Sequence, residues 1–508
     1  MRCLLWGTGK VAERYVKSGM FAGHKIVAFV DTFKRADSFF DCPVLSVDEV
    51  SQLDFDVCVV CVAKNNDEIL QLCVDKNFDL SKFFFPFACD GFGNVPIQYA
   101  NLLIQAGSIK TDFPVLYQNV LELQMAKKYI SDNAEIFSDT ALIRKIGQEY
   151  VVAWIPVELL FSERTDDYVS RTNFKTATKE WRLFHSQYSD IPLVGFEPHR
   201  TLFSFFRNGD AYPRKYLDWY QSVFVTQGLA VPLSDVEILK KRFREFRIMQ
   251  SELNKGMQFF VDLPAKATWN ERGYFNLWDG HHRSMFLYVS GCSKIPVQIS
   301  TLDYEKWSNQ DSAIKLKELV ASQKRVEFYQ PIPNPYFLNL NTNRDNFCKS
   351  RLHHLMEYFN ATKFAGKRVV DIGANIGYFG SHFARLGADV TMVEPDLAHF
   401  ELAKQARDLL HIKCQIVNQK FEVYEDFQHF DMAILLTVLY HYLSNEQIKR
   451  LFFEKLNEMV DEMIVWESGD DPDYEKTQII ENTKFKNYTH LAYTYATRRF
   501  RELGLFSV

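Results

Sequence analysis

The residues best suited to chemistry lie in the last third of the chain, where positions 371–380 have the sequence DIGANIGYFG. Glycine at two of these positions allows a sharp turn and lets a ligand press against the backbone. Glu394 follows the next predicted strand, where a carboxylate can accept hydrogen bonds from a ribose diol. This spacing predicts a nucleoside-type cofactor site with the candidate residues Asp371, Gly373, Asn375, Gly377, Glu394 and Asn418.

A second candidate site lies in the middle of the chain, at the turn from Asp279 to Arg283, whose sequence is DGHHR. A turn at a helix N-terminus offers free backbone N–H groups, here joined by two imidazoles and a guanidinium. The pattern predicts phosphate binding, whereas a surface turn whose aspartate caps the helix is the structural alternative. The candidate phosphate- or nucleotide-binding residues are Asp279, Gly280, His281, His282, Arg283 and His199.

A third glycine turn, with the sequence GTGK, begins at Gly7. Gly7 and Gly9 lie between a predicted strand and a predicted helix, and Asp31 ends the following strand, as in a dinucleotide site. A module in which the glycines only pack the helix on the strand is equally consistent with this pattern.

The elements that position these groups alternate between strand and helix. In the C-terminal part, strands are predicted at 367–370, 389–393, 413–417, 431–436 and 463–467. The middle turn is expected to lie between a strand at 274–278 and a helix at 284–290, with another strand at 294–300. Residues 97–148 are predicted to be mainly helical.

DIGANxGYF followed by VEPD resembles class I methyltransferases, especially their FkbM-like and saccharide-modifying groups. The resemblance implies S-adenosylmethionine as the cofactor and a fourth-strand end that faces the methyl donor. Tyr440 and His441 follow that strand and are therefore the candidate catalytic residues. An imidazole titrates near neutral pH, so His441 is the candidate base. A structural histidine that caps the helix beginning near Asn445 is equally consistent with the sequence.

DGHHR, with the helix and strand that follow it, resembles the ParB/sulfiredoxin-like fold, which includes nucleotide-dependent free-serine kinases. The resemblance implies contact with the phosphates of ATP, ADP or another nucleotide, together with Mg²⁺ if the domain is a kinase. The segment 195–200, GFEPHR, is similar to the stretch that carries the kinase carboxylate, but Arg200 stands where the base is expected. Kinase chemistry would need Glu197, Glu158 or another carboxylate.

The N-terminal signature WGTGKxAE followed by FVD resembles small Rossmann-like modules of bacterial sugar-modifying and polysaccharide-biosynthesis proteins. The predicted fold class is therefore multidomain α/β, with a central α+β ParB/sulfiredoxin-like domain and a seven-stranded Rossmann-like methyltransferase domain. The predicted boundaries are 1–95 for the Rossmann-like module, 96–149 for a helical connector, 150–330 for the middle domain and 331–508 for the methyltransferase.

Composition narrows the function classes. A net charge of −5 over 508 residues provides no general attraction for nucleic acid. No apolar run is long enough to span a membrane, and no signal peptide is visible, so a cytoplasmic location is expected. Cys58 and Cys61 form a CxxC, but strand alternation sends them to opposite faces, and no metal site is predicted. Arg344 and Arg351 are interpreted as solvated helix charges in preference to anion ligands.

The favoured hypothesis is O-methylation of a saccharide or saccharide phosphate in surface polysaccharide biosynthesis, with a nucleotide- or phosphate-binding middle domain. One alternative is a bifunctional kinase-methyltransferase that phosphorylates and methylates the end of a glycan. Another makes the first two domains non-catalytic scaffolds that bind a biosynthetic complex.

Overall fold

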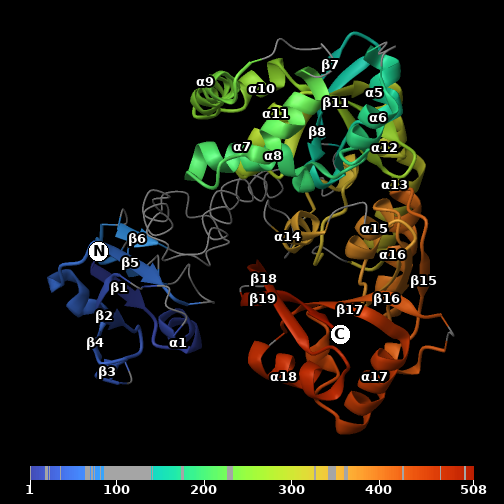
Figure 1. Ribbon diagram of the computed structural model, residues 1–508. Helices are drawn as coiled ribbons and strands as arrows, with labels where there is room; N and C mark the ends of the chain where they lie inside the picture. The colour runs from blue at the N-terminus through green and yellow to red at the C-terminus, as the bar shows by residue number, and fades with distance from the viewer. Residues whose placement is uncertain are drawn as a thin grey trace. The chain divides into compact units, whose positions relative to one another are not determined.

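The computed structural model describes residues 2–62 and 69–84 with short gaps, 139, 141–172, 177–225, 233–324, 328–340, 342, 350–359, 364–425, 428–469, 471–496 and 499–508. The chain divides into two compact units, one built on the N-terminal sheet and the other on the two sheets that follow. Figure 1 colours these sheets blue, green and orange to red in chain order. Among the described residues, no helix has the length and apolar character needed to cross a membrane.

The N-terminal module is a mainly parallel sheet whose described strands have the order β3-β4-β2-β1-β5-β6. Helix α1 connects β1 to β2 as predicted, because Gly7 turns the chain with a φ of +114°. The elements are β1 (Arg2–Trp6), α1 (Lys10–Lys17), β2 (Lys25–Val30), β3 (Ser38–Phe39), β4 (Cys42–Leu45), η1 (Val47–Gln52), β5 (Val57–Val60) and β6 (Phe83–Phe84).

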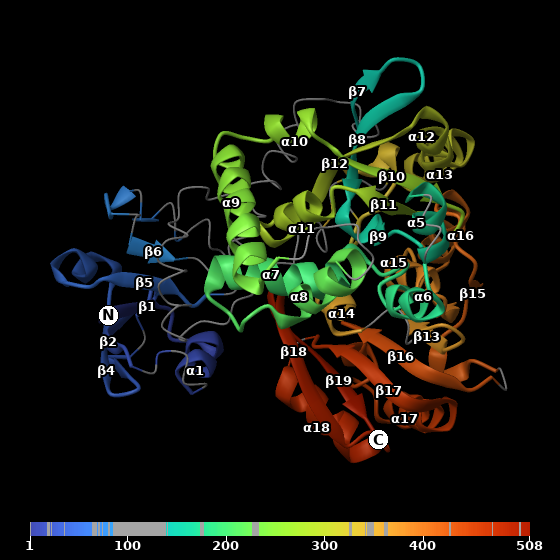
Figure 2. The same cartoon turned by 45° about the horizontal axis from the view of Figure 1, so that its top comes forward.

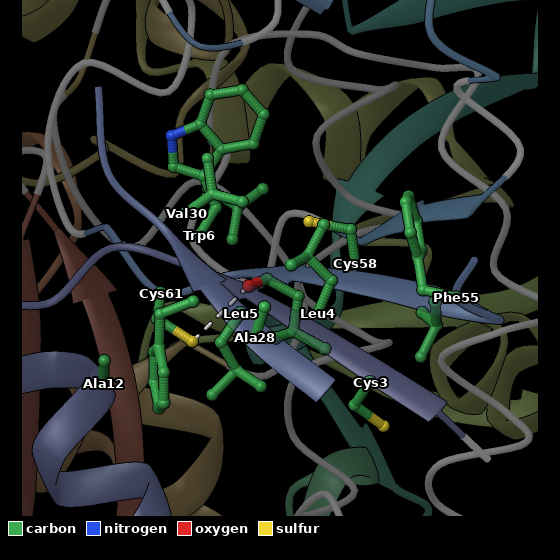
Figure 3. Packing of buried hydrophobic residues seen from close by; sticks show 14 of the residues in the cluster. Cys3, Leu4, Leu5, Trp6, Ala12, Ala28, Val30, Phe55, Cys58 and Cys61 are labelled. Atoms are coloured by element: carbon green, nitrogen blue, oxygen red, sulfur yellow. Dashed lines mark hydrogen bonds between the residues drawn. The ribbon is translucent and has the colours of Figure 1, made fainter. Parts of the chain in front are cut away.

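Side chains of β1, β2 and β5 form the core of this module, as Figure 3 shows for Leu4, Leu5 and Ala28. Cys58 and Cys61 belong to the same core. Burial raises the pKa of both thiols well above the usual range, so they remain protonated at neutral pH. The described residues contain no cluster of three or more potential metal ligands.

The middle domain is built on a mixed sheet whose described strands have the order β7-β8-β12-β10-β11-β9. The predicted strands around DGHHR are present as β11 and β12. Residues 142–146, however, form a strand and not part of a helical connector, because they pair with β8 in an antiparallel hairpin. The strands are β7 (Leu142–Ile146), β8 (Tyr150–Pro156), β9 (Leu160–Ser162), β10 (Ala265–Asn270), β11 (Tyr274–Asp279) and β12 (Lys294–Ser300).

Some of the middle-domain helices lie around α11, which begins at the DGHHR turn. Figure 2 shows α7, α8 and α9 near this helix, and α7 and α9 both contact it. The helices are α5 (Thr165–Thr172), α6 (Lys179–Ser186), α7 (Glu197–Asn208), α8 (Arg214–Tyr220), α9 (Asp235–Leu253), α10 (Gln258–Asp262), α11 (His281–Val289), α12 (Thr301–Ser308) and α13 (Gln310–Ser322).

The C-terminal domain is built on a sheet with the order β15-β14-β13-β16-β17-β19-β18 in its described part. Pairing is parallel from β15 to β17, whereas β19 runs antiparallel to β17. Its elements are α14 (Arg351–Tyr358), β13 (Arg368–Ile372), α15 (Tyr378–Arg385), β14 (Asp389–Val393), α16 (Leu397–Leu409), β15 (Gln415–Val417), β16 (Phe430–Leu436), α17 (Glu446–Met459), β17 (Val460–Glu467), α18 (Pro472–Asn482), β18 (Asn487–Ala496) and β19 (Arg499–Ser507).

The middle and C-terminal domains share a hydrophobic core within the second unit. Helix α13 supplies Leu316 and Val320, and the C-terminal domain supplies Leu402 and Leu409. The Asn309 side chain also donates a hydrogen bond of 3.3 Å to the Leu409 carbonyl. These contacts hold the last helices of the middle domain against α16.

Candidate cofactor and phosphate sites

The glycine turn after β13 is closely packed. Gly373 has a φ of +69°, and a Cβ there would lie 2.9 Å from Val438 Cγ2. Gly377 has a φ of +79°, and its Cβ would lie 2.8 Å from Met392 Sδ. Both positions require glycine because of the backbone conformation and because of the space. Asn375 adopts a positive φ of 54° between them.

Glu394 lies at the carboxyl end of β14, beside this turn. Its carboxylate accepts hydrogen bonds from the backbone N–H groups of Asn375, at 2.7 Å, and Asp396, at 2.9 Å. Burial nevertheless raises its pKa above the usual range. The Asn418 amide donates to the Glu394 carbonyl at 2.8 Å, which fixes the neighbouring strand end. Glu394, Asn375 and Asn418 are thus brought together at one edge of the sheet.

Asp371 lies under the same turn, on β13. Its carboxylate accepts a hydrogen bond of 2.9 Å from the backbone N–H of Gly380, at the start of α15. Burial raises the pKa of Asp371 to about 7, with Glu394 contributing in the same direction. This carboxyl group therefore positions α15 behind the glycines.

The end of β16 packs against the glycine turn through Val438. Tyr440 and His441 follow on the single turn η9 (Leu439–His441), with ring centroids 3.9 Å apart. His441 is accessible to solvent, but the neighbouring atoms displace part of its hydration, which lowers its pKa and favours the neutral imidazole at neutral pH. The predicted capping role is wrong, because Asn445 accepts the N–H bonds of Gln447 and Ile448 itself.

An unpredicted ion pair lies beneath this strand end. Arg351 Nη1 is 2.9 Å from Glu467 Oε2, and the two side chains are 2% and 0% exposed. The Thr437 hydroxyl also donates to Glu467. The interpretation of Arg351 as a solvated charge is therefore wrong: packing of α14 against the sheet buries it. Arg344 lies outside the described residues.

The DGHHR turn forms the wall of a cavity of about 430 Å³. Gly280 is the N-cap of α11 with a φ of +84°, and no side chain caps the helix. Asp279 lies 3.6 Å from Arg283 and 3.8 Å from Lys266, so it does not take the capping role considered as the alternative. Outside the turn, the residues that line the cavity include His199, Trp219, Arg242 and Trp278.

Three histidines meet at this cavity. His199 and His282 have ring centroids 4.2 Å apart, and His199 is 1% exposed with neither ring nitrogen hydrogen-bonded. Burial lowers the pKa of His281 to about 4 and the pKa values of His199 and His282 well below the usual range. The positive charge that an anion would meet therefore comes from Arg283 and Arg242, not from the imidazoles.

A carboxylate that the sequence did not single out lines an adjoining cavity of about 280 Å³. Glu163 is 7% exposed, and Arg171 donates two hydrogen bonds of 2.9 Å to it. This cavity shares Trp219, Trp278 and His281 with the first. Strand β9 ends one residue before Glu163 and pairs with β11 across more than one hundred residues of sequence, so no local pattern could reveal it.

The other two carboxylates considered for kinase chemistry lie elsewhere. Glu197 starts α7 and is paired with Lys215. Glu158 accepts a hydrogen bond of 3.5 Å from the Tyr378 hydroxyl in the C-terminal domain. Neither Glu197 nor Glu158 lines the DGHHR cavity or the adjoining cavity that contains Glu163.

In the N-terminal module, Gly7, Gly9 and Asp31 line one cavity of about 400 Å³. Asp31 accepts a hydrogen bond from Thr8 and a 3.0 Å bond from the backbone N–H of Phe33. The three predicted residues are thus brought together.

Comparison with known families identifies part of the chain. Residues 340–465 match the model of a methyltransferase domain. The chain carries a methyltransferase domain. The predicted enzyme class, a methyltransferase, is thereby confirmed, and the Rossmann-like sheet is the fold of this domain. Residues 1–82 match the N-terminal domain of C2185-like proteins. No curated protein matches the chain.

Solved structures show limited likeness. The bifunctional kinase-methyltransferase WbdD is 20% identical over 38% of this chain and 46% of its own, with a TM-score of 0.31. The methyltransferase NodS from Bradyrhizobium japonicum WM9 is 14% identical over 28% of this chain and 87% of its own, with a TM-score of 0.25. The chain therefore spans about half the length of WbdD, and these likenesses leave its substrate open.

Proposed function

We propose that the C-terminal domain binds S-adenosylmethionine at the Gly373–Gly377 turn and methylates a hydroxyl of a saccharide or saccharide phosphate. The observation that carries this proposal is the Glu394 carboxylate held beside two obligatory glycines at the carboxyl edge of a methyltransferase sheet. When bound, this cofactor supplies a methyl group activated by a sulfonium.

The residues present fit that cofactor. The turn is built on glycine because a Cβ at Gly373 would meet Val438 and one at Gly377 would meet Met392, and a backbone without side chains can be approached closely by the amino-acid portion. Two backbone N–H bonds orient Glu394, so that its carboxylate can accept from a ribose diol. His441 is neutral at neutral pH and can take the proton from the attacking hydroxyl, while Tyr440 packs beside it.

His441→Gln tests the proposed base. We expect kcat to fall by about 10²–10⁴-fold, because proton removal in the transition state is lost. The affinity for S-adenosylmethionine should be unchanged, since the glycine turn is untouched. Because burial lowers the pKa of His441, wild-type kcat should rise with pH only below about pH 6.5 and then level off.

His429→Gln is the matched control, because His429 is an exposed histidine of the same domain, paired with Asp461. It should leave kcat and the pH profile unchanged. Methyl transfer to test saccharides, followed by mass spectrometry, measures both variants. If kcat falls equally in His441→Gln and His429→Gln, or if the pH profile of kcat is unchanged in His441→Gln, then His441 is not the base.

The middle domain is proposed to bind the phosphates of a nucleotide or a phosphorylated acceptor at the N-terminus of α11. An uncapped helix N-terminus, two arginines and the unpartnered His199 support anion binding there. Trp219 and Trp278 offer apolar surface for a base or sugar ring.

Arg283→Gln should weaken binding of ATP, ADP or CTP by about tenfold or more, because a charge-assisted contact with phosphate is lost. Arg244→Gln on α9 removes the same charge outside the cavity and should have no effect. Calorimetric titration of the full-length chain measures both. Tight nucleotide binding that survives Arg283→Gln would contradict the proposed phosphate site.

Glu163 favours a second candidate function, a bifunctional kinase-methyltransferase. A buried carboxylate in the cavity next to the phosphate site is placed to accept a proton from an acceptor hydroxyl. Nucleotide consumption that needs a saccharide and disappears in Glu163→Gln would establish this activity. If no acceptor stimulates consumption, the middle domain binds without catalysing.

A further inference from the structure

A cavity of about 670 Å³ within the second unit is separate from the proposed methyl-donor site and from the proposed phosphate site. Its walls are the turn between β10 and β11, the C-terminal end of α15, and the segment His411–Lys413. The volume lies within the usual range of small-ligand sites. We call it the basic pocket because its cationic lining residues are Arg164, Arg272, Lys306, Arg385 and Lys413.

The residues that line the basic pocket carry an excess of positive charge. Glu271 is the lining carboxylate that faces these five cations. Arg164 is paired with Asp167 at 2.6 Å, and Arg272 lies 3.7 Å from Asp190. In the part of the chain that the structure describes, Lys306 and Lys413 have no ion pair. A cavity with this lining attracts anions.

Arg385 provides an independent indication of a ligand. This guanidinium is 2% exposed and lines the basic pocket. Its Nε donates to the Gly273 carbonyl at 2.9 Å, and its Nη1 contacts His382 at 3.2 Å. Its Nη2, however, is buried without a hydrogen-bond partner. A buried donor without a partner is costly, so this guanidinium keeps an unused hydrogen-bonding group and its positive charge at the wall of the basic pocket.

An aromatic side chain completes the lining. Trp269 makes an edge-to-face contact with Phe275, at a centroid distance of 5.0 Å, and with His411, at 5.8 Å. These neighbours fix the indole ring next to the cations. An apolar ring surface beside several cations suits a sugar that carries anionic groups better than it suits an inorganic ion.

The basic pocket lies at the opposite edge of the sheet from the proposed methyl-donor site. In the basic pocket, Arg385 comes before the amino end of β14, and Lys413 comes before the amino end of β15. In the proposed methyl-donor site, Glu394 follows the carboxyl end of β14, and Asn418 follows the carboxyl end of β15. The five residues of β14 separate the two edges by about 16 Å. A group bound in the basic pocket is therefore not the group that is methylated.

We propose that the basic pocket binds a saccharide segment that carries phosphate or carboxylate groups, at a distance from the methylated end. This inference rests on the proposed saccharide acceptor. It implies that the enzyme holds a charged stretch of the acceptor chain between the middle and C-terminal domains.

The test is calorimetric titration of the full-length protein with tetragalacturonate, mannose 6-phosphate, neutral maltotetraose and a four-nucleotide RNA. The key variant is Lys306→Gln/Lys413→Gln, which removes two exposed charges and leaves the fold intact. Lys240→Gln/Lys241→Gln, on the exposed face of α9, removes the same charge elsewhere. A parallel titration with S-adenosylmethionine reports the proposed donor site separately.

We expect at least one anionic saccharide to bind, with affinity falling about tenfold in Lys306→Gln/Lys413→Gln and unchanged in the control. Preference for tetragalacturonate or mannose 6-phosphate identifies the anionic group. Equal losses in both double variants, equal binding of maltotetraose, tighter binding of a four-nucleotide RNA, or no anion binding would each overturn the proposal. Failure of S-adenosylmethionine binding alone would instead count against the proposed function.

Discussion

Gly373→Ala should lower the affinity for S-adenosylmethionine by at least about tenfold and reduce kcat/KM at least as much. The added Cβ would lie 2.9 Å and 3.1 Å from the two Cγ atoms of Val438, a branched side chain with few alternative rotamers. The segment that carries Val438 must then move, which changes the shape of the turn that is proposed to bind the cofactor. Calorimetry with S-adenosylmethionine measures the affinity directly.

Gly366→Ala separates this steric effect from backbone strain. Gly366 also has a positive φ, of +78°, but a Cβ there meets nothing within 4 Å. Both variants carry the strain of an L residue in the left-handed region, about 1–2 kcal/mol. Cofactor affinity should be unchanged in Gly366→Ala. If the two variants lose affinity equally, the close approach at Gly373 is not what shapes the site.

Arg351→Met should destabilise the second unit by about 3–5 kcal/mol, because it leaves the carboxylate of Glu467 buried without its charge partner. The pair measures 2.9 Å with both groups almost fully buried, and the Arg351 guanidinium also lies 4.7 Å from the centre of the Phe379 ring. Urea unfolding followed by circular dichroism measures the loss. We expect methyl transfer to be lost together with the fold. The segment just after β16 depends on the same ion pair, because the Thr437 hydroxyl also donates a hydrogen bond to Glu467.

Lys367→Met is the comparison for an exposed pair. Lys367 lies 2.6 Å from Glu462 with 39% and 49% of the side chains exposed, so its loss should cost less than about 1 kcal/mol. Arg351→Met/Glu467→Leu should recover most of the stability, because no unpaired charge remains. Equal effects of Arg351→Met and Lys367→Met would contradict the account of the buried pair.

Local sequence was enough to predict the strands and the glycine turn around the proposed cofactor site. The strand predicted at 389–393 is β14, and the strand predicted at 431–436 is β16 to within one residue, because both are short runs of mainly apolar residues. Asp371, Gly373 and Glu394 come together because parallel strands end at the same edge. The short segment 142–146 was mistaken for helix because its strand pairing depends on β8 and not on its own propensity.

Contacts between residues that lie far apart in the sequence could not be predicted. Glu467 lies 116 residues from Arg351, and only packing of α14 on the sheet joins them. Arg242 reaches the DGHHR cavity from α9, and Glu163 reaches the adjoining cavity from the residue after β9, and neither element carries a local sign of these cavities. The charge of the DGHHR histidines could not be predicted either, because it depends on burial, which lowers their pKa values and leaves the imidazoles neutral.

The most direct test of the central claim is calorimetric titration of the wild-type full-length chain with S-adenosylmethionine, repeated with S-adenosylhomocysteine. The account predicts that each binds with a stoichiometry of one per chain and that each displaces the other, because the Gly373–Gly377 turn and Glu394 form a single site. No binding of either compound to folded protein would contradict it.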